Sequence, residues 1–137
     1  MSFTAKASKL TTYFNKRTKQ IESLQHRRTV ILEELHTIDR RVKNAIRAAL
    51  LKIQKRGSRF QFARKSGFSE SEIDNLEQRL KDAKKNCADI FRMKQERTDK
   101  LKNRVKKMNE RLVKLCGQRH VAEMVLKRMH VNKQRGN

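Results

Sequence analysis

A hydrophobic repeat with alternating four- and three-residue steps runs through the first part of this 137-residue chain. Its positions are Leu10, Phe14, Arg17, Ile21, Leu24, Arg28, Ile31, Leu35, Ile38, Val42, Ala45 and Ala49, and all but the two arginines are apolar. An average spacing of about 3.5 residues is typical of a coiled-coil seam, whereas a strand needs period two. The repeat predicts a long helix that pairs with another helix and leaves almost no room for a pocket.

A second repeat of the same kind occupies the later part of the chain. Its positions are Ile73, Leu76, Leu80, Ala83, Cys87, Phe91, Lys94, Thr98, Leu101, Val105, Met108, Leu112 and Leu115. Two successive four-residue steps, from Ala83 to Cys87 to Phe91, indicate a stutter that unwinds the supercoil locally. The chain has no proline, the strongest helix breaker. We therefore predict an all-α fold, a long antiparallel two-helix coiled-coil hairpin in which the two stripes bury each other.

The expected organisation is one helical-hairpin domain. It comprises residues 1–137, with a first helix at about 9–56, a connection at 57–69, a second helix at about 70–116 and a basic helical tail at 117–137. The first helix is predicted to end near Gly57 and Ser58, where helix-poor residues first cluster. Ser69 is the predicted N-cap of the second helix, because Glu72 follows three residues later and completes a capping box.

The position of the turn sets the expected pairing between the helices. A turn centred near Phe62 makes residue i face about 124 − i. This register brings Arg28 close to Glu96 and leaves the residues after Gly117 beyond the paired section. Arg17 and Arg28 occupy seam positions, where they either form a polar layer that fixes the register or extend to the edge of the seam. Pairing of the second helix with a second copy of the chain is an alternative.

The net charge of +22 predicts a polyanionic partner, such as RNA, DNA, an anionic membrane surface or an acidic protein face. The basic residues are spread over both helices, the connection and the tail, so we expect a uniformly basic surface. The apolar residues, 36% of the chain, are arranged periodically, which argues against disorder.

Two sets of residues are candidate partner-binding sites. The tip set is Arg59, Phe60, Phe62, Arg64 and Lys65, where interleaved basic and aromatic side chains suit base stacking and phosphate contact, or docking into an apolar groove. The chain-end set is Lys6, Lys9, Tyr13, Arg119, Met124, Lys127, Arg128 and Met129, which includes a mildly amphipathic tail. The simpler interpretations are phenylalanines that plug the end of the hairpin and a frayed continuation of the second helix.

The sequence contains no catalytic motif, no glycine-rich phosphate loop and no histidine pair at metal-ligand spacing. We therefore expect a protein that is not an enzyme, with no catalytic residues, no cofactor and no metal. Cys87 and Cys116 form no CxxC motif, which fits a reducing compartment. Because no apolar run approaches the roughly 20 residues of a membrane span and no secretory signal is evident, the expected location is cytoplasmic.

The overall plan resembles the stalk proteins of type III secretion and flagellar export ATPases, the YscO/FliJ type. The likeness rests on the stripes at 10–49 and 73–115, the Ser69-Glu70-Ser71-Glu72-Ile73 segment and the basic run from Lys114 to Arg135. It implies a basic helical hairpin, similar to the central shaft of rotary ATPases, that engages the pore of the secretion ATPase hexamer. The paired chain ends would enter the ring, and the tip would face the export gate or an export chaperone. The rival class is a basic coiled-coil protein that binds nucleic acid, such as a ribonucleoprotein subunit.

Overall fold

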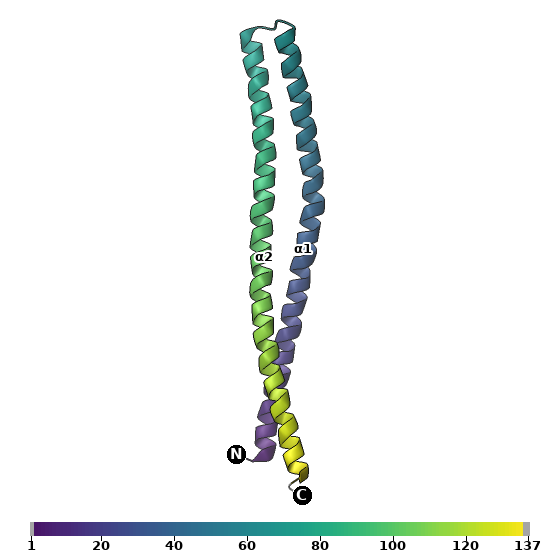
Figure 1. Cartoon of the computed structure of the whole chain (residues 1–137), viewed down its shortest axis with the longest axis vertical. Helices are drawn as coiled ribbons and strands as arrows, with labels where there is room; N and C mark the ends of the chain where they lie inside the picture. The colour runs from purple at the N-terminus through teal and green to yellow at the C-terminus, as the bar shows by residue number, and fades with distance from the viewer. Residues whose placement is uncertain (1, 136–137) are drawn as a thin grey trace. The chain divides into compact units, whose positions relative to one another are not determined.

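The computed structural model describes residues 2–135 and consists of two α-helices (Figure 1). Helix α1 spans Phe3–Lys65 and helix α2 spans Glu70–Arg135. The helices run antiparallel and bury their apolar seams against each other, so the predicted all-α two-helix hairpin is confirmed. The hairpin divides into two compact units. Unit 1 comprises Met1–Glu33 with Lys102–Asn137, and unit 2 comprises Glu34–Leu101.

Helix α1 extends further in both directions than the sequence predicts. It begins at Phe3 rather than near residue 9, and it continues through Gly57 to Lys65. The predicted end at residue 56 and the predicted connection at 57–69 are therefore wrong, because only residues 66–69 separate the helices. A glycine inside a helix costs about 1 kcal/mol relative to alanine. Continued burial of the seam beyond it, including the fully buried Ala63, offsets that cost.

Helix α1 ends in a Schellman motif centred on Gly67. Gly67 has a φ of 70°, in the left-handed region that glycine adopts without steric cost. The Phe68 amide donates a 3.2 Å hydrogen bond to the carbonyl of Ala63, the long-range bond that defines this motif. The rings of Phe62 and Phe68 meet edge to face with centroids 6.0 Å apart, which supplies the apolar contact that accompanies it. These contacts fix the end of the helix here rather than at Gly57.

Helix α2 begins where the sequence predicts. The hydroxyl of Ser69 accepts a 3.3 Å hydrogen bond from the amide of Glu72, so Ser69 is confirmed as the N-cap. Glu70 and Glu72 place negative charge in the first turn, where the helix dipole is positive. The Schellman motif that ends α1 and the N-cap of α2 follow each other directly, so the connection contains only residues 66–69.

Polar contacts within unit 2 establish how the two helices pair. Arg97 donates to the carboxylate of Glu34 at 2.5 Å, and the ammonium of Lys94 lies 3.2 Å from the carboxylate of Asp39. The two pairings place the facing residue seven and nine positions further along α2 than the predicted register does, which is about two to two and a half turns. Glu96, the predicted neighbour of Arg28, instead pairs with Arg92 on its own helix.

Each seam of unit 2 contains one extra four-residue step. The sequence predicts no such step in α1, and in α2 it places the step between Ala83 and Phe91, before its actual position. The inward-facing positions of α1 run through Ile38, Val42, Ile46 and Ala49, and Ala45 is exposed. Those of α2 run through Cys87, Ile90, Lys94 and Thr98, and Phe91 is exposed. The placement of Ala45 and Phe91 in the seams is therefore wrong. Because Lys94 pairs with Asp39, both irregular steps lie at one level of unit 2, where they unwind the supercoil together.

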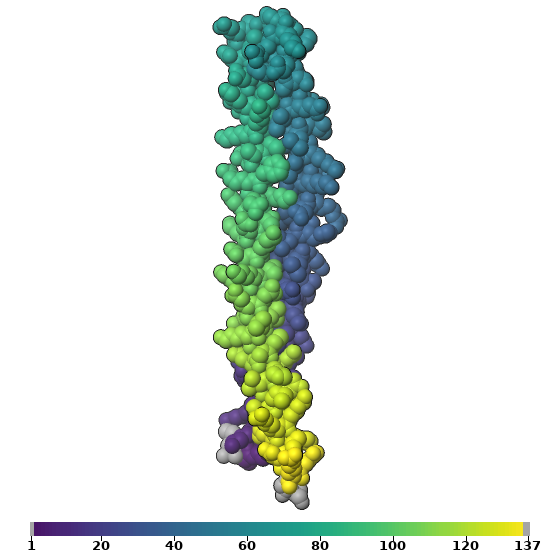
Figure 2. Space-filling view, in the orientation of Figure 1, coloured from purple at the N-terminus to yellow at the C-terminus, as the bar shows by residue number. Residues whose placement is uncertain are grey.

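In unit 1 the beginning of α1 packs against the end of α2. Its core consists of Ile21, Leu24, Leu112 and Leu115, with Met108 and Cys116 packed against it. Beyond this core, the guanidinium of Arg119 lies 6.0 Å from the ring centroid of Phe14. The ammonium of Lys133 lies 5.1 Å from that of Phe3. The expectation that residues after Gly117 extend past the paired section is therefore wrong, and Figure 2 shows the first and last turns gathered at one end of this unit.

Candidate functional site

The basic residues of the chain are distributed unevenly between the two units. Unit 1 contains 18 of the 36 basic residues but only 4 of the 14 acidic residues. In unit 2 several cations are paired, as in the contacts of Arg97 with Glu34 and of Lys94 with Asp39. Unit 1 is consequently the part of the molecule with the larger uncompensated positive charge.

The cations of unit 1 gather on one side of the hairpin. In an antiparallel coiled coil the seam separates two flanks, and each flank of one helix meets the same flank of the other. Gln20, Arg27 and Arg111 belong to one such flank, since they line a single groove beside Leu24. This flank consists of the positions that directly precede a seam position. Its basic residues are Lys6, Lys9, Lys16, Arg27, Arg104, Lys107, Arg111, Lys114, Arg128 and Arg135. We refer to these ten residues as the cationic face.

The opposite flank of unit 1 is nearly neutral. Its basic residues are Lys102, Lys106 and Lys127, and its acidic residues are Glu22 and Glu123. Lys127 is already paired with Glu123 at 3.2 Å. Within residues 2–33 and 102–135, no acidic residue occupies a position of the cationic face. The expectation of a uniformly basic surface is therefore wrong for unit 1, because the phase of the seam separates the charges.

Two grooves open on the cationic side of unit 1. The first lies near the chain ends and has a volume of about 640 Å³; it is lined by Phe3, Lys6, Lys9, Leu10, Val125 and Met129. Its walls are apolar and its rim carries two lysines. The second has a volume of about 330 Å³ and is lined by Lys19, Gln20, Ser23, Leu24, Arg27 and Arg111. It combines three cations with two neutral polar side chains that can also bind an anion.

The seam arginine Arg17 adds to this positive side. Its guanidinium donates a 2.7 Å hydrogen bond to the side-chain oxygen of Gln20 and lies 4.4 Å from the ring centroid of Tyr13. Both partners belong to the same helix, so Arg17 extends to the edge of the seam and does not form a polar layer across it. The Nε atoms of Arg17 and Arg28 are buried without a hydrogen-bond partner, which costs free energy.

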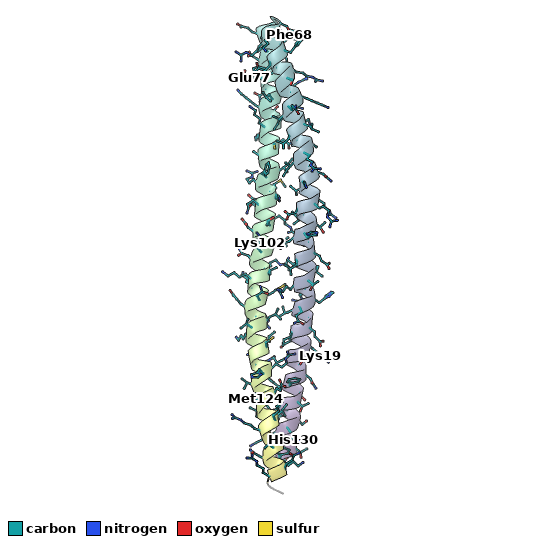
Figure 3. The ribbon with its side chains drawn as sticks, turned by 45° about the vertical axis from the view of Figure 1, so that its right-hand side comes forward. Lys19, Phe68, Glu77, Lys102, Met124 and His130 are labelled. Atoms are coloured by element: carbon teal, nitrogen blue, oxygen red, sulfur yellow. The ribbon has the colours of Figure 1, made fainter. Side chains whose placement is uncertain are left out.

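The structure brings together only part of the predicted chain-end set. Lys6, Lys9 and Met129 line the first groove. Lys127, in contrast, belongs to the opposite flank, and Met124 is 42% exposed on the outer side of α2 (Figure 3). The eight residues therefore do not form one surface.

The predicted tip set lies in the last two turns of α1 and not in a loop. The guanidinium of Arg64 lies 5.6 Å from the ring centroid of Phe60. Phe62 is 65% exposed, and its ring contacts Phe68 in the Schellman motif. At least part of the role of Phe62 is therefore to close the turn.

Sequence reasoning assigned only Lys6, Lys9 and Arg128 of the cationic face to a site. It missed Val125 in the first groove and seven basic residues of the face, which are Lys16, Arg27, Arg104, Lys107, Arg111, Lys114 and Arg135. Each directly precedes a seam position, so the phase of the repeat is the signal that identifies them. The sequence alone did not reveal that these positions of the two helices meet on one side, because that depends on the pairing register.

Residues 2–135 contain no group of three or more histidine, cysteine or acidic side chains arranged to hold a metal ion. No helix in the described part of the chain combines the length and the apolar character needed to cross a bilayer. A comparison with family models, curated proteins and solved structures finds no match to this chain.

Proposed function

We propose that this protein is a non-enzymatic stalk or assembly subunit of a type III protein-secretion apparatus. In this proposal unit 1 engages the secretion ATPase hexamer, and the tip of unit 2 contacts an export chaperone or the export gate. The resemblance set out above supplies the identity of the machine. We assign the ATPase contact to unit 1 because of its cationic face, on which ten basic side chains have no facing carboxylate.

The charges of the cationic face suit attachment more than chemistry. Exposed cations attract an acidic surface over several ångströms and accelerate association, while each individual ion pair contributes only about 0–1 kcal/mol. Many such ion pairs together hold the partner firmly, while each single pair breaks and re-forms easily. That property fits a subunit that must hold its partner and also move against it.

A pull-down of the tagged full-length chain from its native cell, with and without nuclease, tests the proposal. We expect a hexameric ATPase and secretion chaperones to co-purify and to survive nuclease treatment. Two charge-reversed variants indicate which end is used: Lys6→Glu with Arg128→Glu in unit 1, and Arg59→Glu with Lys65→Glu at the tip. Loss of the ATPase with the first variant alone supports the proposal, and recovery of no ATPase at all rejects it.

Nucleic-acid binding is a second candidate function, and the groove at Lys19, Arg27 and Arg111 favours it. Three cations and no acidic side chain line this groove, which is the composition of a phosphate contact. In that case log K falls by about 0.9 per log unit of salt for each phosphate neutralised on a duplex. Partners that disappear after nuclease treatment would establish this function in place of the first.

A further inference from the structure

The cationic side of unit 1 combines charge with an apolar depression. The groove near the chain ends has Phe3, Leu10, Val125 and Met129 as its walls and Lys6 and Lys9 at its rim. Val125 is 37% exposed and Phe3 is 38% exposed, so apolar surface remains open to solvent inside a positively charged border. Covering apolar surface of this kind with a partner's apolar side chains removes it from water and favours binding.

The second groove lies further along the same flank and is mainly polar and charged, because its one apolar lining residue, Leu24, is buried in the core. Leu24 forms part of its lining, and Lys19, Arg27 and Arg111 surround it. Val125 and Arg111 are fourteen residues apart on α2, a separation of about 21 Å along the helix axis. The two grooves therefore lie in line, two heptads apart, with cations on both sides.

We propose that the cationic face of unit 1 binds an acidic amphipathic helix of a partner protein. The inference rests on the proposed function and adds the chemistry of the partner. Apolar side chains of that helix enter the groove at Val125 and Met129, and its carboxylates pair with Lys6, Lys9, Arg27 and Arg111. A helix of about 14 residues or more is needed to span both grooves. The product is a three-helix arrangement in which the partner lies along the hairpin.

The grooves favour a protein helix over a nucleic acid. Phosphates require cations and polar donors, but a phosphate backbone gains little from a depression walled by Phe3, Leu10 and Met129. The unpaired positive charge excludes a basic partner, including a second copy of this surface, because like charges would face each other. An amphipathic helix with acidic flanks matches both the apolar walls and the charged border.

Binding of a designed peptide to the full-length chain tests this inference. The probe is a labelled helical peptide of about 21 residues, with leucine along one face and glutamate on both sides of the leucines. A peptide of identical composition, scrambled so that no apolar face forms, is the control. We expect the amphipathic peptide to bind at least tenfold more tightly than the scrambled one, measured by fluorescence anisotropy at physiological salt.

Two matched pairs of variants locate the binding surface. Arg27→Glu with Arg111→Glu reverses two charges on the cationic face, and Lys102→Glu with Lys106→Glu reverses two on the opposite flank. Both variants lower the net charge of unit 1 equally, so a general Coulomb attraction weakens equally in both. We expect the first to weaken peptide binding at least tenfold and the second less than threefold. Circular dichroism verifies that both variants remain helical.

The apolar contribution is tested in the same way, by Val125→Asp in the groove and Val113→Asp outside it. Val113 is 75% exposed, so its replacement leaves the packing of unit 1 intact. Only Val125→Asp is expected to weaken the peptide complex. Equal effects at both positions, equal effects of the two charge reversals, or tight binding of the scrambled peptide would each overturn the inference.

A 20-base-pair RNA duplex completes the experiment. If the duplex displaces the peptide and itself loses affinity with Arg27→Glu and Arg111→Glu, the surface belongs to nucleic acid and the inference is rejected. The peptide assay does not involve the secretion ATPase, so its outcome is independent of the pull-down. If the peptide binds as expected but the pull-down recovers no ATPase, only the proposed stalk function is rejected. If the pull-down recovers the ATPase but the peptide does not bind as expected, only the proposed binding of an acidic helix is rejected.

Discussion

Replacing Gly57 with alanine is expected to stabilise unit 2 by about 1 kcal/mol. Gly57 lies inside α1, and a Cβ atom added there would meet Leu80 Cδ1 at 3.9 Å, an ordinary van der Waals distance. A glycine in a helix interior is about 0.8–1.0 kcal/mol less favourable than alanine, largely because it loses more backbone freedom on folding. Since no clash opposes this gain, nearly all of it should appear as stability.

Gly67→Ala is the matched control, since it is the same chemical change in the same unit. Gly67 has a φ of 70°, and no atom other than its chain neighbours lies within 4 Å of the position of an added Cβ. The cost therefore arises from the backbone alone, about 1–2 kcal/mol for an L-residue in the left-handed region. The two substitutions, ten residues apart on the chain, should change stability in opposite directions.

Thermal unfolding followed by circular dichroism at 222 nm measures both effects. For a unit of this size, 1 kcal/mol corresponds to a change in Tm of about 4–8 °C. We expect Tm to rise for Gly57→Ala and to fall for Gly67→Ala. A fall for both variants would mean that the helix ends at Gly57 in solution, and the reasoning from the Schellman motif would then be refuted.

Three further predictions concern packing and pairing. Ile21→Ala, at a core position that is 2% exposed, should lower the stability of unit 1 by about 2–5 kcal/mol in urea unfolding, and a cost below 1 kcal/mol would contradict its burial. Phe62→Ala should cost about 0.5–1.5 kcal/mol through loss of the ring contact at the turn, and an unchanged midpoint would show that the contact does not form. Cysteines replacing Glu34 and Arg97, in a background without the two native cysteines, should be joined within one chain by a short bismaleimide, whereas cysteines replacing Glu34 and Glu77 should not. Only intermolecular product on gel electrophoresis would show that α2 pairs with a second copy.

The fold was predictable because the two stripes encode it directly. The apolar side chains at coiled-coil spacing between Leu10 and Ala49 predict a long helix that is buried against a second helix with a similar stripe. The N-cap at Ser69 was predictable for a similar reason, since a capping hydroxyl followed by a glutamate is a local signal. Both features depend on residues close together in the sequence.

The turn was harder to locate because two glycines compete for it. Gly57 stands beside Ser58, whereas Gly67 is followed by Phe68, which directly precedes the N-cap Ser69. What selects Gly67 is the contact of Phe62 with Phe68, which forms only when the chain reverses between them. An error in the turn centre is doubled in the register, so a shift of about four residues became seven to nine residues in the pairing.

The irregular steps of the seams could not be located from either helix alone. Ala45 and Ile46 are both apolar, and a repeat that continues through Ala45 satisfies the spacing. Burial of isoleucine gains more free energy than burial of alanine. Ile46 is therefore the preferred seam residue wherever the partner helix can accommodate a four-residue step from Val42. Helix α2 accommodates this step because it also has two successive four-residue spacings, from Ile90 to Lys94 to Thr98, at the level where Lys94 pairs with Asp39. Only the paired helices contain this information.

The one-sided charge of unit 1 has a consequence for the proposed stalk. A uniformly basic shaft would attract every acidic subunit of a ring equally, whatever its rotation. The cationic face instead directs ten basic residues to one side and leaves the opposite flank nearly neutral. In a ring of identical subunits, such a surface contacts one or two subunits more strongly than the others. The charge reversals at Arg27 and Arg111 should therefore weaken the ATPase complex, and reversals at Lys102 and Lys106 should not. An equal loss from both would mean that the ring responds to total charge, and the asymmetry would then have no part in the contact.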